Sequence, residues 1–292
     1  MKPTELKDKI NNLSVWKKGG QRAPHKPLLI LYALSHFQAG KNRLIPYREV
    51  REVLTDLLVE FGPKRKSYHP EEPFVRLQRD GIWELDMQVN RSNPSNKLLL
   101  EKHISGGFTE EVTRVLEEHP HLVHELVEIV LEEHFPETLH DDILRHVGLE
   151  LVYRGKKQKQ RDPRFREKIL RAYEYSCAIC GFNVRLGNHL VGIEAAHIKW
   201  HQAGGPDTEE NGIALCSMHH KLFDRGVFTL AENRTFLVAE SANGTNGFDE
   251  WLMRYHGQSI RSPIHPAYRP EISYVNWHVR EVFKGPERYY SV

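Results

Sequence analysis

Residues 215–224 read LCSMHHKLFD, a stretch that places Cys216 three residues before His219 and sets His219 directly beside His220. Successive side chains on a helix point about 100° apart, so two neighbouring histidines face different surroundings. We therefore expect His219 and His220 to have separate partners. The residues around this stretch indicate what those partners are.

The three cysteines of the chain, Cys177, Cys180 and Cys216, all fall between residues 177 and 216. Cys177 and Cys180 form a C-x-x-C pair that can place two thiolates on one metal ion. Cys216 and His219 supply a second pair at matching C-x-x-H spacing. The four residues predict a structural Zn²⁺ site, and the alternative is two core cysteines with an unrelated third.

The overall composition is that of a globular protein with little net charge. The chain has 292 residues, 39% hydrophobic and 27% charged, with a formal net charge of +2. That charge alone does not indicate a nucleic-acid binder, because a local basic groove can exist within a near-neutral total. The sequence has neither an apolar run long enough to span a membrane nor the apolar stretch of a signal peptide. We expect a cytoplasmic protein, in which disulfides are rare.

The pattern of apolar residues predicts an α+β protein with a helix-rich N-terminal half. Helices are expected over 25–37, over 47–62, and as a pair within 110–135 that breaks near Pro120. A hairpin is expected over 74–85, around Asp80-Gly81. In the second half we expect a helix over 164–176, a strand over 191–198, a loop over 199–212, a strand that runs into the helix of LCSMHHKLFD, and a strand over 227–230. The basic stretch 154–168 is the predicted linker, with the domain boundary near 155–160.

His197, Asn211 and His220, together with the cysteine framework, resemble the HNH nuclease family over residues 164–230. The family fold is a ββα-metal unit. The resemblance implies that His197 is the general base that activates water for attack on a phosphodiester. It also implies that His220 is a ligand of one divalent cation, Mg²⁺, Mn²⁺ or a similar ion, and that Asn211 is a ligand or a loop anchor.

This chemistry suits those residue types. An imidazole has a pKa near neutrality and can accept a proton from water at physiological pH. A divalent cation stabilises charge on the phosphate and on the leaving oxygen, which a neutral base cannot do. The full set of residues therefore favours a catalytic role for His197, which in isolation would be read as a satisfied strand histidine.

One feature departs from the family pattern. Many members have an acidic residue or a histidine as metal ligand directly before the catalytic histidine, where this chain has Ala196. Glu194 shares the strand face of Ala196 and could replace the missing ligand. Asp224, four residues after His220, is a second candidate ligand, and its alternative is a salt bridge to a neighbouring Lys or Arg. His201 could also reach the site from its loop.

The N-terminal half resembles the sulfur-binding domain of modification-dependent (type IV) restriction endonucleases. The resemblance rests on RAPHKPLLILYAL (22–34), YHPEEPFVRLQRDGIWEL (68–85), ISGGF (104–108) and HFPETLHDDILRHVGL (134–149). Members of that family recognise DNA in which sulfur replaces a non-bridging phosphate oxygen. The resemblance implies a DNA-recognition domain over residues 1–155 and an HNH endonuclease domain over 156–292.

A sulfur atom is larger, softer and less hydrated than oxygen, so a pocket of proline rings and aromatic edges gains contact with it. A nearby cation must still balance the phosphate charge. The residues expected at this surface come from two segments and are Arg22, His25, Lys26, Tyr68, Pro70, Pro73 and Phe74. The alternatives are ordinary core packing for Phe74 and a solvated helix start for Lys26. Glu72 could lie beside a phosphate only if it pairs with a cation.

These features predict an endonuclease that cleaves double-stranded DNA near phosphorothioate marks, with a homodimer as one way to cut both strands. A first alternative is an HNH endonuclease that reads a modified base such as methylcytosine, with Trp83 and Tyr68 stacking on a flipped base. A second alternative is a non-cleaving DNA-binding protein in which zinc serves only for folding. The C-terminal stretch 274–292 is expected to pack on the HNH unit.

Overall fold

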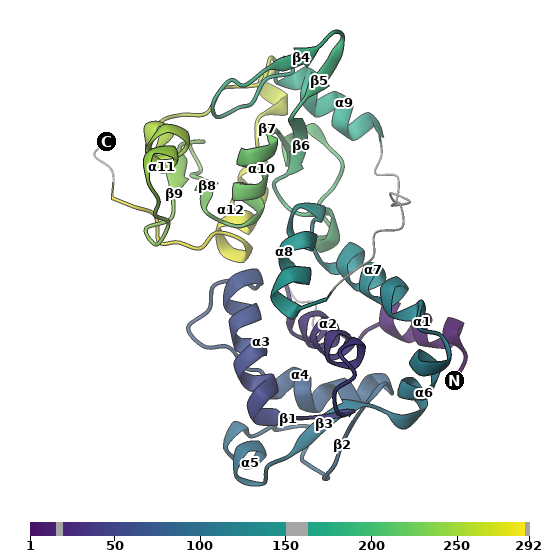
Figure 1. Cartoon of the computed structure of the whole chain (residues 1–292). Helices are drawn as coiled ribbons and strands as arrows, with labels where there is room; N and C mark the ends of the chain where they lie inside the picture. The colour runs from purple at the N-terminus through teal and green to yellow at the C-terminus, as the bar shows by residue number, and fades with distance from the viewer. Residues whose placement is uncertain (16–19, 150–162, 290–292) are drawn as a thin grey trace. The chain divides into compact units, whose positions relative to one another are not determined.

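The computed structural model describes residues 1–15, 20–149 and 163–289. It divides the chain into two compact units, Met1–Tyr153 and Arg154–Val292 (Figure 1). Most of the predicted linker, residues 154–162, lies outside the described residues. The rest of it is not a linker, because Pro163 already begins a helix, α9.

Unit 1 is built mainly from helices, with one small sheet. Its helices are α1 (Pro3–Asn11), α2 (His25–Gln38), α3 (Tyr47–Phe61), α4 (Glu71–Arg76), η1 (Leu77–Asp80), α5 (Asn96–Glu101), α6 (Glu110–Glu118), α7 (Leu122–His134) and α8 (Glu137–Val147). Its strands β1 (Leu44–Pro46), β2 (Trp83–Leu85) and β3 (Ser105–Phe108) form an antiparallel sheet in the order β1-β3-β2.

Helix α2 is the centre of unit 1. All residues from Lys26 to His36 are buried, so the helix is covered on every side, and it packs against α3, α4, α7 and α8. Pro27 lies in its first turn, where a missing N–H costs nothing. The predicted helices over 25–37 and 47–62 and the helix pair around Pro120 are confirmed.

The hairpin predicted over 74–85 is wrong. Phe74 lies in α4, and the chain continues as the 3-10 helix η1 to Asp80. Gly81 then adopts a left-handed conformation, φ 69°, that ends this helical run before strand β2. The apolar residues before Asp80 are instead spaced along a short helix whose inner face is buried, whereas the run after Gly81 does form a strand, which pairs with β3.

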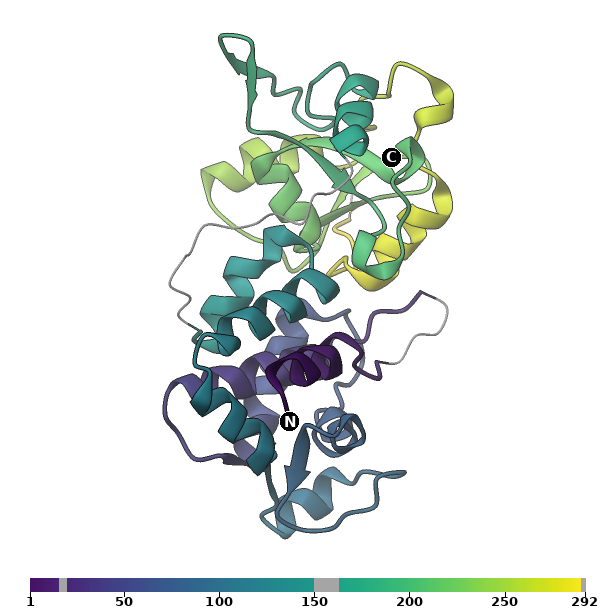
Figure 2. The ribbon, with the colours of Figure 1, turned by 90° about the vertical axis from the view of Figure 1, so that its right-hand side faces the viewer.

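Unit 2 contains three two-stranded antiparallel sheets, β4-β5, β6-β7 and β8-β9. The strands are β4 (Val184–Leu186), β5 (His189–Val191), β6 (Ile193–His197), β7 (Gly212–Cys216), β8 (Phe228–Leu230) and β9 (Phe236–Val238). The helices are α9 (Pro163–Ala172), η2 (His201–Ala203), η3 (Glu209–Asn211), α10 (Ser217–Asp224), α11 (Asn246–Trp251), η4 (Met253–Tyr255), η5 (Pro266–Tyr268) and α12 (Ile272–Glu281). The β4-β5 hairpin projects from the rest of the unit (Figures 1 and 2).

Strands β6 and β7 and helix α10 form the ββα arrangement that the sequence predicts. Helix α9 packs across both strands, and α10 follows β7 without an intervening loop. The C-terminal stretch packs on this unit, as expected. The ring of His278, from α12, stacks on Phe223 with centroids 3.7 Å apart, and Trp277 lies edge-on to Trp200.

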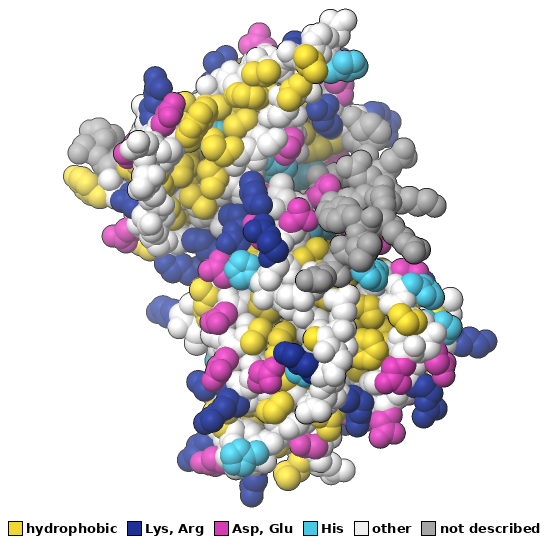
Figure 3. Space-filling model, viewed as in Figure 1, with side chains coloured by type: hydrophobic (Ala, Val, Ile, Leu, Met, Phe, Trp, Pro, Cys, Tyr) yellow, Lys and Arg dark blue, Asp and Glu magenta, His cyan; other side chains and the backbone are white. Residues whose placement is uncertain are grey.

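Within the described residues, no helix is long and apolar enough to cross a membrane. On the face drawn in Figure 3, Lys and Arg side chains lie among Asp and Glu side chains on both units. Charge is thus mixed on this face, in keeping with the small net charge of the chain. Contacts to a polyanion must therefore come from local groups of side chains.

Candidate functional site

The β6-β7 register sets the positions of the expected site residues. Ile193 pairs with Cys216 at one end of the two strands, and His197 pairs with Gly212 at the other. Cys216 is also the residue that precedes the first turn of α10. One end of this sheet therefore leads into the cysteine and histidine cluster, and the other end carries His197.

Cys177, Cys180, Cys216 and His219 come together, and their ligand atoms all lie within 4.8 Å of one another. The Nδ1 atom of His219 is 3.1 Å from Sγ of Cys216 and 3.7 Å from Sγ of Cys177. The Sγ atoms of Cys180 and Cys216 are 4.0 Å apart. Tetrahedral zinc with bonds of about 2.3 Å to sulfur places two sulfurs about 3.8 Å apart, so these side chains fit a Zn²⁺ ion.

Two further observations support a cation in this cluster. Hydrogen bonds with the thiols of Cys180 and Cys216 lower the pKa of Cys177, whereas contact with the neighbouring sulfurs raises the pKa of Cys216. A bound cation would offset the repulsion between thiolates in this cluster. The Nε2 atom of His219 lies 2.8 Å from the carbonyl oxygen of Trp251, which orients Nδ1 toward the sulfurs.

His197 is held by a carboxylate and by an aromatic ring. Its Nε2 atom lies 2.7 Å from Oδ1 of Asp207, in the loop between β6 and β7. The ring of Phe165, from α9, stacks on its imidazole with centroids 4.0 Å apart and planes 12° apart. The ring of His201 lies 6.0 Å away by centroids, so this loop histidine does reach the site. The His197 side chain is 10% exposed, which leaves it accessible but fixed in orientation.

Gly212 makes the stacking of Phe165 possible. A Cβ atom on Gly212 would lie 2.1 Å from Cδ1 of Ile169 and 3.2 Å from Cζ of Phe165. Both of these residues belong to α9. A side chain at position 212 would therefore push α9 away from the strands and lift the Phe165 ring from His197.

Asn211 anchors the loop that carries Asp207. Its Oδ1 atom accepts a hydrogen bond from the backbone N–H of Lys199, at 2.8 Å. Its Nδ2 atom donates to the carbonyl oxygens of Lys199 and Pro206, at 3.0 and 2.9 Å. Both amide hydrogens are thus used, and the side chain is fully buried. Of the two expected roles, metal ligand and loop anchor, this geometry favours the anchor.

His220 lies between two carboxylates. Its Nδ1 atom is 2.7 Å from Oε2 of Glu194, and its Nε2 atom is 3.2 Å from Oδ2 of Asp224. Burial alone would lower the pKa of His220, but the charge of Asp224 and hydrogen bonds to both carboxylates raise it to about 9. The hydrogen bond from His220 lowers the pKa of Glu194. Without a metal ion, the ring is a cation that donates to both acids.

The two acids differ in their surroundings. Asp224 is buried and accepts a second hydrogen bond from Nε1 of Trp200, at 3.0 Å. His220 and Trp200 are thus two of its partners, and the metal ion or basic residue that the sequence suggested stays a prediction. The Glu194 side chain is 42% exposed and accepts a hydrogen bond from Ser217, at 2.6 Å. Glu194 with Nδ1 of His220 can therefore bind an ion from solvent, while Asp224 holds Nε2, as carboxylates do behind metal-binding histidines.

Lys26 requires a correction, because it does not face a surface. Its Nζ atom lies 2.5 Å from Oδ2 of Asp80 and 2.9 Å from the carbonyl oxygen of Ser14. The Lys26 and Asp80 side chains are only 11% and 3% exposed. A lysine in a buried ion pair holds unit 1 together and cannot contact a phosphate.

Phe74 requires the same correction. It is fully buried and contacts Tyr47 and Trp83 at ring centroid distances of 4.9 and 6.0 Å, so the core-packing alternative holds. Trp83 is itself 2% exposed, which removes it as a surface for a flipped base. Pro70 and Pro73 are buried as well.

Arg22, His25 and Tyr68 are partly exposed and border a basic loop. Burial, helped by the charges of His69 and Arg65, lowers the pKa of His25 from 6.5 to about 4, so His25 is neutral at pH 7. Arg22 donates a hydrogen bond to the carbonyl oxygen of Phe61, at the end of α3. Glu72 pairs with Arg76 at 2.7 Å, and this supplies the cation that an acid beside a phosphate would need.

Sequence reasoning missed several residues of these sites. Asp207 and Phe165 belong to the loop and the helix beside His197, and neither lies in the motif that identified the base. The run Lys64-Arg65-Lys66 is exposed and close to His25. Its charge pattern could have been noticed, whereas the partners of His197 depend on how the loop closes.

Comparisons with known proteins agree with both halves of this description. Residues 3–152 match the family model of the ScoMcrA-like DNA sulfur-binding domain, and residues 177–231 match that of the HNH endonuclease. No curated protein matches the chain significantly.

Solved structures with similar folds include two described as sulfur-binding domains complexed with phosphorothioated DNA. The one from SprMcrA is 20% identical, with a TM-score of 0.44, over 51% of this chain and 95% of that one. The one from ScoMcrA is 20% identical, with a TM-score of 0.42, over 49% and 95%. The type IV phosphorothioation-dependent restriction endonuclease ScoMcrA is 20% identical, with a TM-score of 0.40, over 57% and 38%.

The family model of the sulfur-binding domain covers more than half of the chain, and the HNH match covers the segment that holds the Cys177, Cys180, Cys216 and His219 cluster, His197 and His220. The chain belongs to the family of ScoMcrA-like DNA sulfur-binding proteins and is an HNH endonuclease.

Proposed function

We propose that this protein recognises phosphorothioated DNA with residues 1–155 and hydrolyses phosphodiester bonds of that DNA with residues 156–292. The cleavage half of the proposal rests on the hydrogen bond between His197, at the end of β6, and Asp207, in the loop that follows. The cysteine and histidine cluster lies at the other end of the same sheet. A structural zinc site alone would need neither this pair nor the His220 group.

In the proposed mechanism, His197 is the general base. The Nε2–H group of His197 donates a hydrogen bond to Asp207, so the ring is protonated on Nε2 and carries its lone pair on Nδ1. Nδ1 then takes a proton from the attacking water. Asp207 is a positioning residue that fixes this tautomer and stabilises the imidazolium that forms. The Phe165 ring holds the imidazole plane, and Asn211 holds the loop of Asp207.

HNH nucleases use divalent metals. We assign Glu194 and Nδ1 of His220 as the residues that would hold a Mg²⁺, Mn²⁺ or similar ion, with Asp224 as the partner of Nε2. When bound, such an ion stabilises negative charge on the phosphate and the leaving oxygen. Cys177, Cys180, Cys216 and His219 would hold a structural Zn²⁺ that fixes the start of α10, and with it the direction of His220.

For DNA recognition we propose the surface around His25, Tyr68 and Arg22, bordered by Lys64, Arg65 and Lys66. A neutral His25 cannot balance a phosphate charge at pH 7, so the arginines and lysines of the border supply it. His25 and Tyr68 then offer a weakly hydrated wall, which favours sulfur over oxygen. The buried rings of Pro70 and Pro73 lie behind this surface.

The test compares cleavage of three matched plasmids that are unmodified, cytosine-methylated or phosphorothioated, each with Mn²⁺. We expect cutting of the phosphorothioated plasmid alone, and no cutting by His197→Ala. The His189→Ala variant, which alters an exposed hairpin histidine, is the matched control and should cut normally.

Cutting confined to methylated DNA would show that the protein recognises a modified base and not sulfur, and it would leave the nuclease assignment intact. Binding of phosphorothioated DNA without cutting in any divalent metal would refute the catalytic mechanism and leave sulfur recognition intact. Equal cutting by His197→Ala and the wild type would remove His197 as the base. A homodimer that cuts both strands at once would produce linear plasmid without accumulation of a nicked intermediate.

A further inference from the structure

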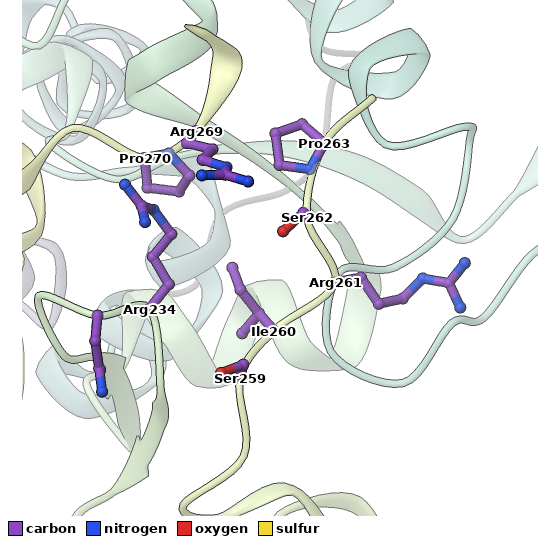
Figure 4. Close-up of a pocket in the computed structure, with 9 residues that line it drawn as sticks. Arg234, Ser259, Ile260, Arg261, Ser262, Pro263, Arg269 and Pro270 are labelled. Atoms are coloured by element: carbon purple, nitrogen blue, oxygen red, sulfur yellow. The ribbon is translucent and has the colours of Figure 1, made fainter. Parts of the chain in front are cut away.

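A pocket of about 200 Å³ lies in unit 2, and none of the residues assigned to cleavage lines it. Three segments line it: the turn between β8 and β9, the stretch that follows η4, and the residues before α12. The lining residues are Asn233, Arg234, Ser259, Ile260, Arg261, Ser262, Pro263, Arg269 and Pro270 (Figure 4).

The backbone holds the walls of this pocket in place. The N–H of Ile260 donates to the carbonyl oxygen of Arg234, at 3.1 Å, which joins two walls. The N–H of Arg261 donates to the carbonyl oxygen of Ala178, at 2.9 Å, between the cysteines Cys177 and Cys180. One wall of the pocket is therefore tied by its backbone to the segment that carries Cys177 and Cys180.

The lining has the chemistry of an anion site. It contains three arginines, two serines and one asparagine, and no Asp or Glu. Within the part of the chain that the structure describes, Arg234, Arg261 and Arg269 form no ion pair with a carboxylate. The Nε atom of Arg234 is buried and has no hydrogen-bond partner there. Buried N–H groups usually find an acceptor, so this donor is available to a group that enters the pocket.

Arg234 and Arg269 face the pocket, and Arg261 does not. In Figure 4 the guanidinium groups of Arg234 and Arg269 lie at the end of the pocket beside Pro270, and the hydroxyl of Ser262 points inward. The side chain of Arg261 extends away from them. The ligand would therefore bind between Arg234 and Arg269.

The backbone of Arg234 supports a functional role for its side chain. Its φ is +67°, in the left-handed region that glycine adopts without strain and a long side chain does not. A turn between two short strands would form more readily with glycine here. A strained residue of this kind is a reason to look for a function of the side chain.

We propose that this pocket binds a phosphate group, held by the guanidinium forks of Arg234 and Arg269 with the hydroxyl of Ser262. Guanidinium matches phosphate oxygens with two parallel N–H donors, which a lysine cannot do. The volume holds one phosphate with several waters, since one water takes about 30 Å³ of liquid. The phosphate can belong to a DNA backbone or be free in solution, and both sources offer the same acceptors.

The experiment uses the full-length protein without added divalent metal. Binding of inorganic phosphate is measured by calorimetry at constant ionic strength, and binding of an unmodified 20-base-pair duplex by fluorescence anisotropy over a range of salt. Arg234→Gly removes the side chain and tolerates the φ of this position, so it should fold. Arg269→Gln is the second variant. Arg261→Gln, which changes the same charge on a side chain that points away, is the matched control.

We expect Arg234→Gly and Arg269→Gln each to weaken binding of inorganic phosphate about tenfold or more, the loss of a charge-assisted hydrogen bond. Arg261→Gln should keep the wild-type affinity. If the phosphate is that of a DNA strand, the two variants also weaken duplex binding and lower its salt slope by about one. If it is free phosphate, duplex binding stays as in the wild type.

Phosphate binding of wild-type strength in both Arg234→Gly and Arg269→Gln would overturn the proposal. So would an equal loss in Arg261→Gln, because it would show that only net charge matters. The readout is binding to unmodified ligands without catalysis. The result is therefore independent of sulfur recognition and of the assignment of His197.

Discussion

Oδ1 of Asp207 lies 2.7 Å from Nε2 of His197, although ten residues of chain separate them. The carboxylate comes from the loop that Asn211 closes, and the histidine from the end of β6. Proper closure of the loop is therefore a condition for a correctly oriented base.

Replacement of Asp207 by Asn should lower kcat for DNA cleavage by about 100-fold or more, because the tautomer of His197 is no longer fixed. KM should change little, since Asp207 does not bind DNA. Single-turnover cleavage at saturating enzyme measures the effect. The exposed Asp249→Asn variant removes the same charge elsewhere in unit 2 and should cut normally. A rise in KM at unchanged kcat would assign Asp207 to DNA binding instead.

Glu194→Gln and Asp224→Asn should have different effects, because Glu194 is proposed to bind the ion and Asp224 to hold the His220 ring. In Glu194→Gln we expect the Mn²⁺ concentration for half-maximal cleavage to rise about tenfold or more, because a charged ligand is lost. Asp224→Asn should lower the free energy of unfolding, because His220 loses the charge of its buried partner. A metal titration of cleavage, together with thermal unfolding, measures both. Normal cleavage by Glu194→Gln in limiting metal would contradict its role.

Removal of one proposed zinc ligand should lower both the zinc content and the thermal stability of the protein. Cys180→Ser and His219→Ala should contain no stoichiometric zinc and unfold at a temperature lower by about 10 °C or more, since each kcal/mol corresponds to roughly 2–4 °C. Elemental analysis and thermal unfolding measure the two effects. His189→Ala should keep its zinc. Zinc that stays bound at full stoichiometry in Cys180→Ser would exclude a four-ligand site.

Lys26→Met should destabilise unit 1 without removing a DNA contact. It leaves Asp80 charged and buried, which costs about 3–5 kcal/mol of folding free energy. The double variant Lys26→Met/Asp80→Asn should recover part of this loss. Lys7→Met breaks the exposed pair with Glu125 and should cost about 1 kcal/mol or less. Chemical denaturation measures all three, and similar losses for Lys7→Met and Lys26→Met would refute the buried pair.

His25 should make unit 1 less stable in mild acid. Its pKa is about 4 in the folded chain and 6.5 when unfolded, so the unfolded chain binds the proton more tightly. Stability is therefore full above pH 6.5 and falls as the pH drops from 6.5 toward 4. In His25→Gln this fall should be smaller. An NMR titration should show one histidine with a midpoint near 4 that is absent from this variant, and a midpoint near 6.5 would contradict the burial.

The grouping of the three cysteines with His219 could be predicted from sequence because its spacing is local. Cys177 and Cys180, like Cys216 and His219, need only one turn of chain to face one ion. Strand alternation and helical spacing placed Glu194 and Asp224 near His220 as candidate ion ligands, but did not predict that both acids bond to the His220 ring itself. Such periodicities need no knowledge of the rest of the fold.

Residues whose role depends on distant packing could not be predicted. Lys26 lies in a basic, proline-rich stretch that suggests a surface, and only the fold brings buried Asp80 to it. Phe74 follows two acidic residues and a proline, and a helix start there turns it inward. Asp207 lies in a loop whose closure depends on the buried amide of Asn211.

Phe165 lies two residues after Pro163, at the first turn of α9, and its ring rests on the imidazole of His197. Phe165 thus links the first turn of α9 to the side chain proposed as the general base, through a stacking contact. A tilt of this first turn would move the ring that holds the imidazole of His197 beside Asp207. A change in the chain before α9 could then affect cutting through movement of the first turn of this helix alone.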